Sequence, residues 1–241
     1  MFAMSHNGEL DKTSLDFLLN ELAKILKTTY GRKAQPMEII LVGGAAIIVN
    51  HLFRRSTQDV DAWLFSEQML GQSIRQVGER FGLSHHWLNQ DFVKTSSFSQ
   101  KLREVSAHYK TFQRILEVRV IQGSDLIAMK LIAGRKYKND LSDIVGVLME
   151  YEEQQRPISL DQINQSLLTL YGQSEFPDAE LMHWLKQLMQ HGSYRKVYDQ
   201  VRREEANNQS VVIEAIEQGP SIFNESDVDA MLALIRERKD K

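Results

Sequence analysis

Two aspartates separated by a single residue carry the clearest chemistry in this sequence. Asp59 and Asp61 belong to a short segment of strand-forming residues, and side chains alternate along a strand, so both carboxylates are expected on one face. Val60, Ala62 and Leu64 are then expected on the other face. Aspartate is disfavoured in strands and two anions on one face repel each other, so a positive partner is expected opposite them. A Mg²⁺ ion meets this need, because it is commonly held by one or two carboxylates and completed by waters and substrate phosphates.

A glycine pair upstream of the two acids predicts a phosphate site. Residues 38–42 have the pattern of a buried strand, which ends in Gly43 and Gly44 where a helix begins. Such a turn brings backbone N–H groups and the positive end of the helix dipole to one point, and this favours anions. A basic and polar corner with Arg55 and Thr57 follows the helix and supplies further candidate nucleotide ligands. The phosphate site and the acidic pair are therefore expected to face each other.

Together these features resemble the nucleotidyltransferase superfamily, and specifically its AbiEii-like branch. The superfamily is recognised by a Gly-Gly or Gly-Ser turn that is followed, about one helix later, by an Asp-x-Asp strand. The AbiEii-like branch adds a Lys-x-x-Ala…Arg helix and then an Asp at the start of the next helix. The corresponding residues here are Gly43, Gly44, Asp59, Asp61, Lys130, Ala133, Arg135, Asp140 and Asp143. Gly44 stands where many members have serine, and Tyr137 stands at the usual position of the branch's Arg. The resemblance covers residues 38–148, and four ordered elements make it more specific than any one of them.

The resemblance implies roles for residues of the later helices. Lys130 would bind the triphosphate as a point charge, Arg135 would extend a positive patch beside it, and Asp143 would act as a base or orienting group. Each of these residues also has a structural alternative. Lys130 can extend to solvent from the margin of a buried stripe, and Arg135 can belong to a solvated helix end. Asp143 can complete the capping of a helix that begins at Asn139 or Asp140.

One further carboxylate is a candidate metal ligand. The superfamily often draws a third carboxylate from a strand next to the Asp-x-Asp strand, and Glu117 is the only acid in the strand expected over residues 112–121. The resemblance therefore implies that Glu117 joins Asp59 and Asp61 in holding one or two Mg²⁺ ions. The alternative is an ion pair of Glu117 with Arg119, or across the sheet, on an exposed face.

Composition places the chain among ordinary globular proteins. Its 241 residues, 42% hydrophobic and 25% charged, suffice for one large domain or two modest ones. The absence of cysteine excludes disulfides, thiolate metal sites and cysteine nucleophiles. No apolar run approaches about 18 residues and the first residues lack a signal-peptide pattern, so a cytoplasmic protein without a membrane partner is expected. A net charge of -3 limits any contact with nucleic acid to local patches.

The order of the expected elements predicts two domains and an α+β fold. Amphipathic helices over residues 13–28 and 66–83 flank the strands. With the resemblance, this predicts a nucleotidyltransferase domain with a mixed sheet over residues 1–155. Strand signals then disappear and short loops join helical segments, so residues 156–241 are expected to form a helical bundle. Its expected segments are 159–171, 178–191, 193–206, 209–218 and 225–238.

The resemblance implies an enzyme that transfers a nucleoside monophosphate from an NTP to a hydroxyl of an RNA, tRNA included, or of a protein. Members of the AbiEii-like branch are often toxins of toxin–antitoxin pairs, so a cognate antitoxin is an implied partner. A basic and aromatic stretch of the bundle suits RNA, although a solvated helix explains it equally well; it comprises Tyr194, Arg195, Lys196, Tyr198, Arg202 and Arg203. The alternative function is that of a non-catalytic nucleic-acid- or protein-binding module that keeps a nucleotidyltransferase scaffold.

Overall fold

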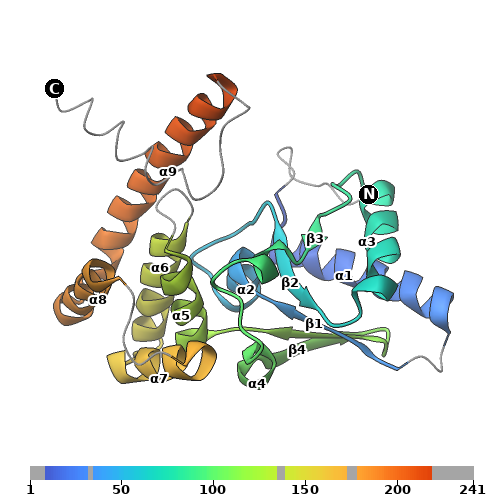
Figure 1. The fold of residues 1–241 in the computed structure, drawn as a ribbon, viewed down its shortest axis with the longest axis horizontal. Helices are drawn as coiled ribbons and strands as arrows, with labels where there is room; N and C mark the ends of the chain where they lie inside the picture. The colour runs from blue at the N-terminus through green and yellow to red at the C-terminus, as the bar shows by residue number, and fades with distance from the viewer. Residues whose placement is uncertain (1–8, 32–34, 135–138, 173–177, 219–241) are drawn as a thin grey trace. The chain divides into compact units, whose positions relative to one another are not determined.

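The computed structural model describes residues 9–31, 35–134, 139–172 and 178–218 (Figure 1). The chain forms two compact units. The first combines Met1–Met129 with Asp161–Ser174, and the second combines Lys130–Leu160 with Glu175–Lys241. The chain therefore leaves the first unit between Met129 and Lys130 and returns to it at Asp161. The domain boundary expected near residue 156 stays a prediction.

A five-stranded mixed sheet is the centre of the first unit. Its strands are β1 (Met37–Leu41), β2 (Val60–Leu64), β3 (Leu88–Asn89), β4 (Ala107–Phe112) and β5 (Leu116–Val120), in the spatial order β3-β2-β1-β5-β4. The central strand β1 is antiparallel to β2 and parallel to β5. The mixed sheet and its flanking helices confirm the expected α+β fold.

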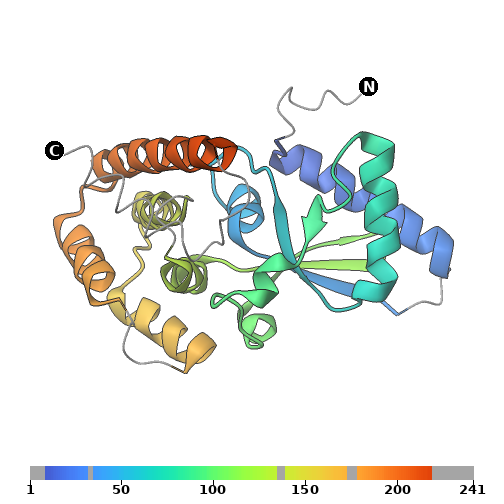
Figure 2. The same cartoon turned by 45° about the horizontal axis from the view of Figure 1, so that its top comes forward.

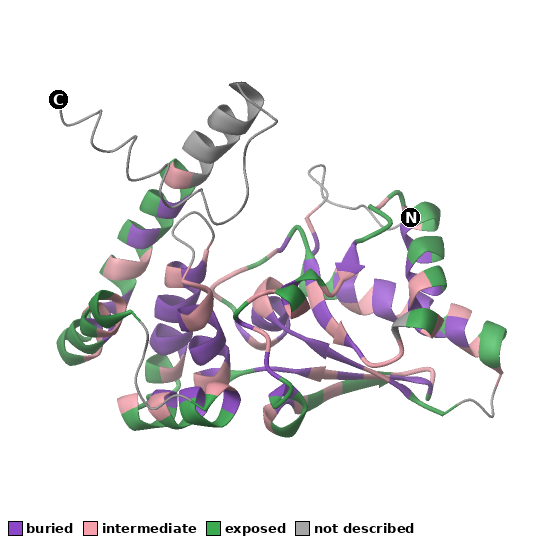
Figure 3. Ribbon diagram, in the orientation of Figure 1, coloured by how far each residue is buried: buried purple, intermediate pink, exposed green. Residues whose placement is uncertain are grey.

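The two faces of this sheet differ in exposure (Figure 3). Val60, Ala62 and Leu64 of β2 are buried, whereas Asp61 and Trp63 between them are only half-buried. Strand β5 repeats the pattern, because its buried apolar residues alternate with half-buried charged ones. One face therefore belongs to the hydrophobic core, and the other keeps polar side chains partly accessible. The alternation expected around the second aspartate of the pair is confirmed.

Helices flank the sheet of the first unit. They are α1 (Lys12–Tyr30), α2 (Gly43–Asn50), α3 (Glu67–Phe81), the 3-10 helix η1 (Asp91–Lys94), α4 (Leu102–Val105), the beginning of α5 (Gly123–Ala133) and α7 (Leu160–Tyr171). The Asp11 side chain caps α1 by accepting a hydrogen bond from Ser14 N at 2.7 Å. The Tyr171 hydroxyl donates to Ser97 O at 2.8 Å and ties α7 to the loop after η1. This bond joins α7 to the rest of the first unit.

Strands β4 and β5 form a hairpin where the sequence predicts a single strand over residues 112–121. The turn passes through Gln113 and Arg114, which adopt positive φ angles of 50° and 60°. Such turns normally contain glycine or asparagine, because the left-handed region costs other residues roughly 1–2 kcal/mol. Neither glycine nor asparagine is present at this turn, so the sequence carries no signal for it.

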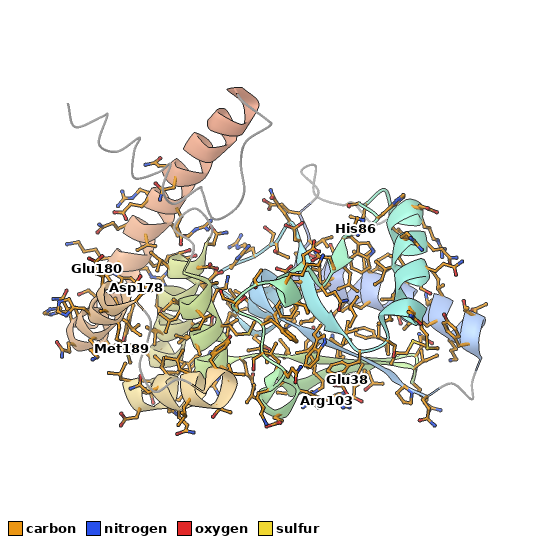
Figure 4. The ribbon with its side chains drawn as sticks, in the orientation of Figure 1. Glu38, His86, Arg103, Asp178, Glu180 and Met189 are labelled. Carbon is orange, nitrogen blue, oxygen red and sulfur yellow. The ribbon has the colours of Figure 1, made fainter. Side chains whose placement is uncertain are left out.

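The second unit is helical, as expected for the C-terminal part of the chain. It contains α6 (Asp140–Glu153), α8 (Ala179–His191) and α9 (Tyr194–Gln218). At the start of α8 the Asp178 side chain accepts a hydrogen bond from Glu180 N at 3.0 Å (Figure 4). The separate helices expected at 193–206 and 209–218 are one continuous α9, because no glycine or proline interrupts them. The helix expected at 225–238 lies outside the described residues. Among the described helices, none has the length and apolar character needed to cross a membrane.

Candidate active site

The junction between β1 and α2 is suited to an anion. Helix α2 follows β1 directly, with Val42 as its N-cap, and no side chain caps it within the described part of the chain. Ala46 N donates to Val42 O at 3.1 Å and makes the first bond of the helical ladder. The amides of the first turn, which begins with Gly43 and Gly44, therefore lie at the positive end of the helix dipole without a capping side chain. A phosphate group binds readily in such a place.

The carboxylate of Asp61 lies against this turn. Val42 N donates to Asp61 O at 3.0 Å, so β2 passes directly beside the junction. Gly43 has a φ of +54°, and a Cβ atom at this residue would lie 3.3 Å from Asp61 Oδ2. Glycine at this position therefore permits both the left-handed backbone and the close approach of the acid. The structure brings the glycine turn and one member of the acidic pair together.

Gly44 is enclosed by the corner that follows α2. A Cβ atom at Gly44 would lie 2.5 Å from Thr57 Oγ1 and 3.2 Å from Arg54 Nη2. Thr57 is held by two backbone hydrogen bonds with Leu10, of 2.8 and 2.9 Å. Its hydroxyl donates to Asp59 O at 3.0 Å. The space that a serine side chain would need at residue 44 is therefore taken by the hydroxyl of Thr57, which explains the glycine.

Arg54 belongs to this corner, although the sequence does not single it out. Its guanidinium lies beside Gly44, and its Nε donates to Ser56 O at 3.0 Å. Arg55, the predicted nucleotide ligand, is exposed on the same loop. Two adjacent arginines are equivalent in a sequence, and the path of the loop decides where each guanidinium lies.

Asp59 lies one residue before β2 and is exposed. Val60, which separates it from Asp61, is fully buried. The two acids therefore flank a residue anchored in the core, and both are at least partly accessible. A Mg²⁺ ion fits this pair of donors, because magnesium takes one or two carboxylates and completes its octahedral shell with water and phosphate oxygens.

Glu117 lies elsewhere on the sheet. Asp61 is level with Val42, at one end of β1. Glu117 pairs with Glu38 at the other end of β1, about 13 Å away along the strand at the usual rise per residue. Arg119 Nη1 lies 3.9 Å from Glu117 Oε1, so the structure shows the ion pair. Within the described residues no three histidine, cysteine, aspartate or glutamate side chains are grouped to hold a metal ion. Because of its distance from Asp61 and its ion pair with Arg119, we do not include Glu117 in the metal site proposed below.

Lys130 and Asp143 lie together in the second unit. Lys130 Nζ lies 2.7 Å from Asp140 Oδ1 and 2.8 Å from Asp143 Oδ2, and all three residues are buried. Burial disfavours the charge of Lys130, but attraction and hydrogen bonding from the two aspartates outweigh burial, and the pKa of Lys130 is raised above its ordinary value. The ammonium group thus pairs with two buried carboxylates and does not extend to solvent. Arg135 lies outside the described residues.

A further acid of this cluster comes from a distant part of the chain. Glu205 of α9 is buried and bonds to the backbone of Leu141, from which it is 64 residues away in sequence. The sequence predicts Asn139 or Asp140 as the cap of α6. Asn139 is the N-cap residue, but its side chain makes no capping hydrogen bond. No local sequence pattern identifies Glu205 as the cap of α6, because this contact forms only when two helices pack together.

The sequence profile of one protein family matches residues 17–167, more than half of the 241-residue chain. The family is described as a nucleotidyltransferase of unknown function (DUF6036). This chain belongs to the DUF6036 nucleotidyltransferase family. Comparisons with curated proteins and with solved structures gave no match.

The assignment to DUF6036 confirms the nucleotidyltransferase superfamily, which the glycine turn and the acidic pair indicate in the sequence. The matched residues include Asp59, Asp61, Lys130 and Asp143, and they end before α8 and α9. Glu205 therefore lies outside the part of this DUF6036 chain that the family profile covers. The AbiEii-like branch stays a prediction.

Proposed function

We propose that this protein transfers a nucleoside monophosphate from a nucleoside triphosphate to an acceptor hydroxyl in a Mg²⁺-dependent reaction. One observation carries the proposal: Asp61 Oδ2 lies beside Gly43, where α2 begins. A carboxylate that can bind a cation and a helix end that can bind an anion are adjacent there. A metal-bound triphosphate requires both. Membership of a nucleotidyltransferase family supports the same conclusion.

The residues around the turn have distinct proposed roles. The amides of Gly43 and Gly44 bind phosphate oxygens, and the guanidinium of Arg54 adds a positive charge beside them. Asp59 and Asp61 hold Mg²⁺, which when bound neutralises charge on the phosphates. These residues position the substrate and stabilise its charge, which are the main sources of catalysis in phosphoryl transfer.

The proposed reaction forms one bond and breaks one bond at the α-phosphorus. The acceptor oxygen attacks this atom in line, its new bond to phosphorus forms, and the bond between the α-phosphorus and the oxygen bridging to the β-phosphate breaks. Pyrophosphate leaves with that oxygen. The proton of the acceptor passes to a carboxylate of the site or to water.

We propose a hydroxyl of an RNA, tRNA included, or of a protein as the acceptor, and a toxin of a toxin–antitoxin pair as the biological role. The resemblance to the AbiEii-like branch supports both. Arg195, Lys196 and Arg203 are exposed on α9, which is compatible with an RNA backbone. Growth arrest on expression that is relieved by Asp61→Asn would support the toxin role. Normal growth at full expression would oppose it.

Incubation of the purified protein with each labelled NTP, Mg²⁺ and total RNA or lysate tests the proposed reaction. We expect label on one class of acceptor, and none with Asp59→Asn or Asp61→Asn in protein that stays folded by circular dichroism. Asp91→Asn is the matched control, because Asp91 is an exposed aspartate of η1. Glu117→Gln should also keep activity, because Glu117 is distant from the acidic pair along the sheet.

Activity retained by both acid variants would contradict the proposal. If no acceptor is labelled, calorimetry separates two remaining cases. Mg²⁺-dependent nucleotide binding that Asp61→Asn abolishes indicates an enzyme whose acceptor was missing from the assay. No nucleotide binding indicates the non-catalytic scaffold.

A further inference from the structure

Helix α6 is capped by a side chain of another helix. In the second unit α9 runs along α6 (Figures 1 and 2). Glu205 Oε1 accepts hydrogen bonds from Leu141 N and Ser142 N, at 3.0 and 3.1 Å. These are the two amides that an N-cap side chain normally binds. The N-cap residue Asn139 is itself engaged by α9, because Arg202 Nη1 donates to its Oδ1 at 2.6 Å.

The capping carboxyl group lies in a cluster that already holds two other acids. Asp140 and Asp143 of α6, Lys130 of α5 and Glu205 of α9 are all buried. An ionised Glu205 would add a further buried negative charge beside Asp143. Arg202, whose charge favours the ionised form of Glu205, is exposed. Buried charge is unfavourable, so a carboxyl group at this place is stabilised by keeping its proton.

Glu205 is the acid whose surroundings favour the proton. Burial raises the pKa of Glu205 most, the charge of Asp143 raises it further, and the result is a pKa of about 7. Hydrogen bonds from Ser142 and the charge of Arg202 act in the opposite direction. The geometry agrees, because Glu205 Oε2 is buried and has no hydrogen-bond partner among the described residues. An anion with an unsolvated oxygen is less stable in such a place than the neutral acid.

We propose that Glu205 is a proton-dependent latch between α9 and α6, and that it positions Asp143. The neutral side chain caps α6 and adds no charge to the cluster. Loss of its proton places a third carboxylate near Asp143, and the hold of α9 on α6 weakens. Asp143 directly follows Ser142, so the same change alters the placement of a residue with a predicted catalytic role. The latch goes beyond the proposed nucleotide transfer and does not depend on it.

Amide hydrogen exchange of the full chain between about pH 6 and 8, corrected for intrinsic exchange rates, tests the latch at Leu141 and Ser142. We expect the protection factors of both amides to fall by up to about tenfold over this range, because the neutral fraction of an acid that titrates near 7 falls by that factor. Glu205→Ala should lower protection at every pH, because the cap is lost. Glu205→Gln keeps the accepting oxygen and should remove the pH dependence. Glu204→Gln is the matched control, because Glu204 is the exposed neighbour on α9.

An unchanged pH dependence in Glu205→Gln, or unchanged protection in Glu205→Ala, would overturn the latch. If Glu205→Ala does not fold, carbon-13 NMR titration of the side-chain carboxyl groups in the unmodified protein tests whether Glu205 keeps its proton near neutral pH. A Glu205 carboxyl that titrates together with that of Glu204 would overturn it. These measurements use no nucleotide, so their outcome is independent of whether the protein proves to be a nucleotidyltransferase in the assay above.

Discussion

Gly43 and Gly44 are each required to be glycine by a different neighbour. At Gly43 the backbone has a positive φ and the neighbour is Asp61, the proposed metal ligand. At Gly44 the backbone places no such demand, and the constraint is the hydroxyl of Thr57. The two glycines that look equivalent in the sequence therefore contribute separately, the first to the chemistry of the site and the second to its packing.

The contact at Gly44 leads to a prediction about stability. Gly44→Ala should lower the free energy of unfolding by about 1–3 kcal/mol, because the new methyl group would lie 2.5 Å from Thr57 Oγ1. Thr57→Ala removes that oxygen, so the double variant should be more stable than the sum of the single effects implies. Urea unfolding of the four proteins gives the coupling energy. Strictly additive effects would show that Thr57 does not obstruct residue 44.

A substitution of Lys130 separates two possible roles of this residue, a structural ion pair and a phosphate ligand. Lys130→Met should lower the free energy of unfolding by about 3–5 kcal/mol, because the buried carboxylates of Asp140 and Asp143 would lose the ammonium group that lies within 2.8 Å of both. Lys101→Met is the control and should change it by less than about 1 kcal/mol, because the pair of Lys101 with Glu104 is exposed. Chemical denaturation measures both. Unchanged stability with weakened nucleotide binding would instead make Lys130 a ligand of the triphosphate.

At the scale of elements, the β4–β5 hairpin depends on an unfavourable turn. Arg114→Gly should raise the free energy of unfolding by up to about 1 kcal/mol, because glycine adopts the observed φ of 60° without steric cost, although it also increases the entropy of the unfolded chain. Lys110→Gly, within β4, should have the opposite sign, because glycine weakens a strand. Thermal unfolding compares the two variants. A loss of stability in Arg114→Gly would show that its side chain supports the turn.

The helices differ in whether the residue that caps their first turn is a neighbour in the sequence. Asp11 and Asp178 cap α1 and α8 from the adjacent residue, so these helices begin close to where the sequence predicts. Helix α6 begins where expected, but its capping oxygen comes from Glu205 of α9. The caps of α1 and α8 are therefore predictable from the local sequence. The cap of α6 is not, because it exists only once two helices have packed.

At the scale of the whole molecule, Glu205 predicts how stability depends on pH. Its pKa in the folded protein is about 7 against an ordinary value of 4.5, so its contribution to stability is complete below about 4.5 and is lost as the pH rises through about 7. The difference corresponds to at most about 3 kcal/mol at high pH. The urea midpoint of the unmodified protein should therefore fall relative to that of Glu205→Gln over this range. Parallel curves for the two proteins would contradict this.

The sequence by itself determined the class of the protein, because the glycine turn, the Asp-x-Asp spacing and the alternation of apolar residues are local patterns set by backbone geometry. It also determined most helices, whose periodicity and capping residues are local. Only the tertiary structure decided that the guanidinium of Arg54 lies beside Gly44, and that Glu117 pairs with Arg119. It also decided that Glu205 completes the buried cluster around Lys130. Each of these outcomes depends on strand register, loop path or helix packing, which the types and spacing of neighbouring residues do not specify.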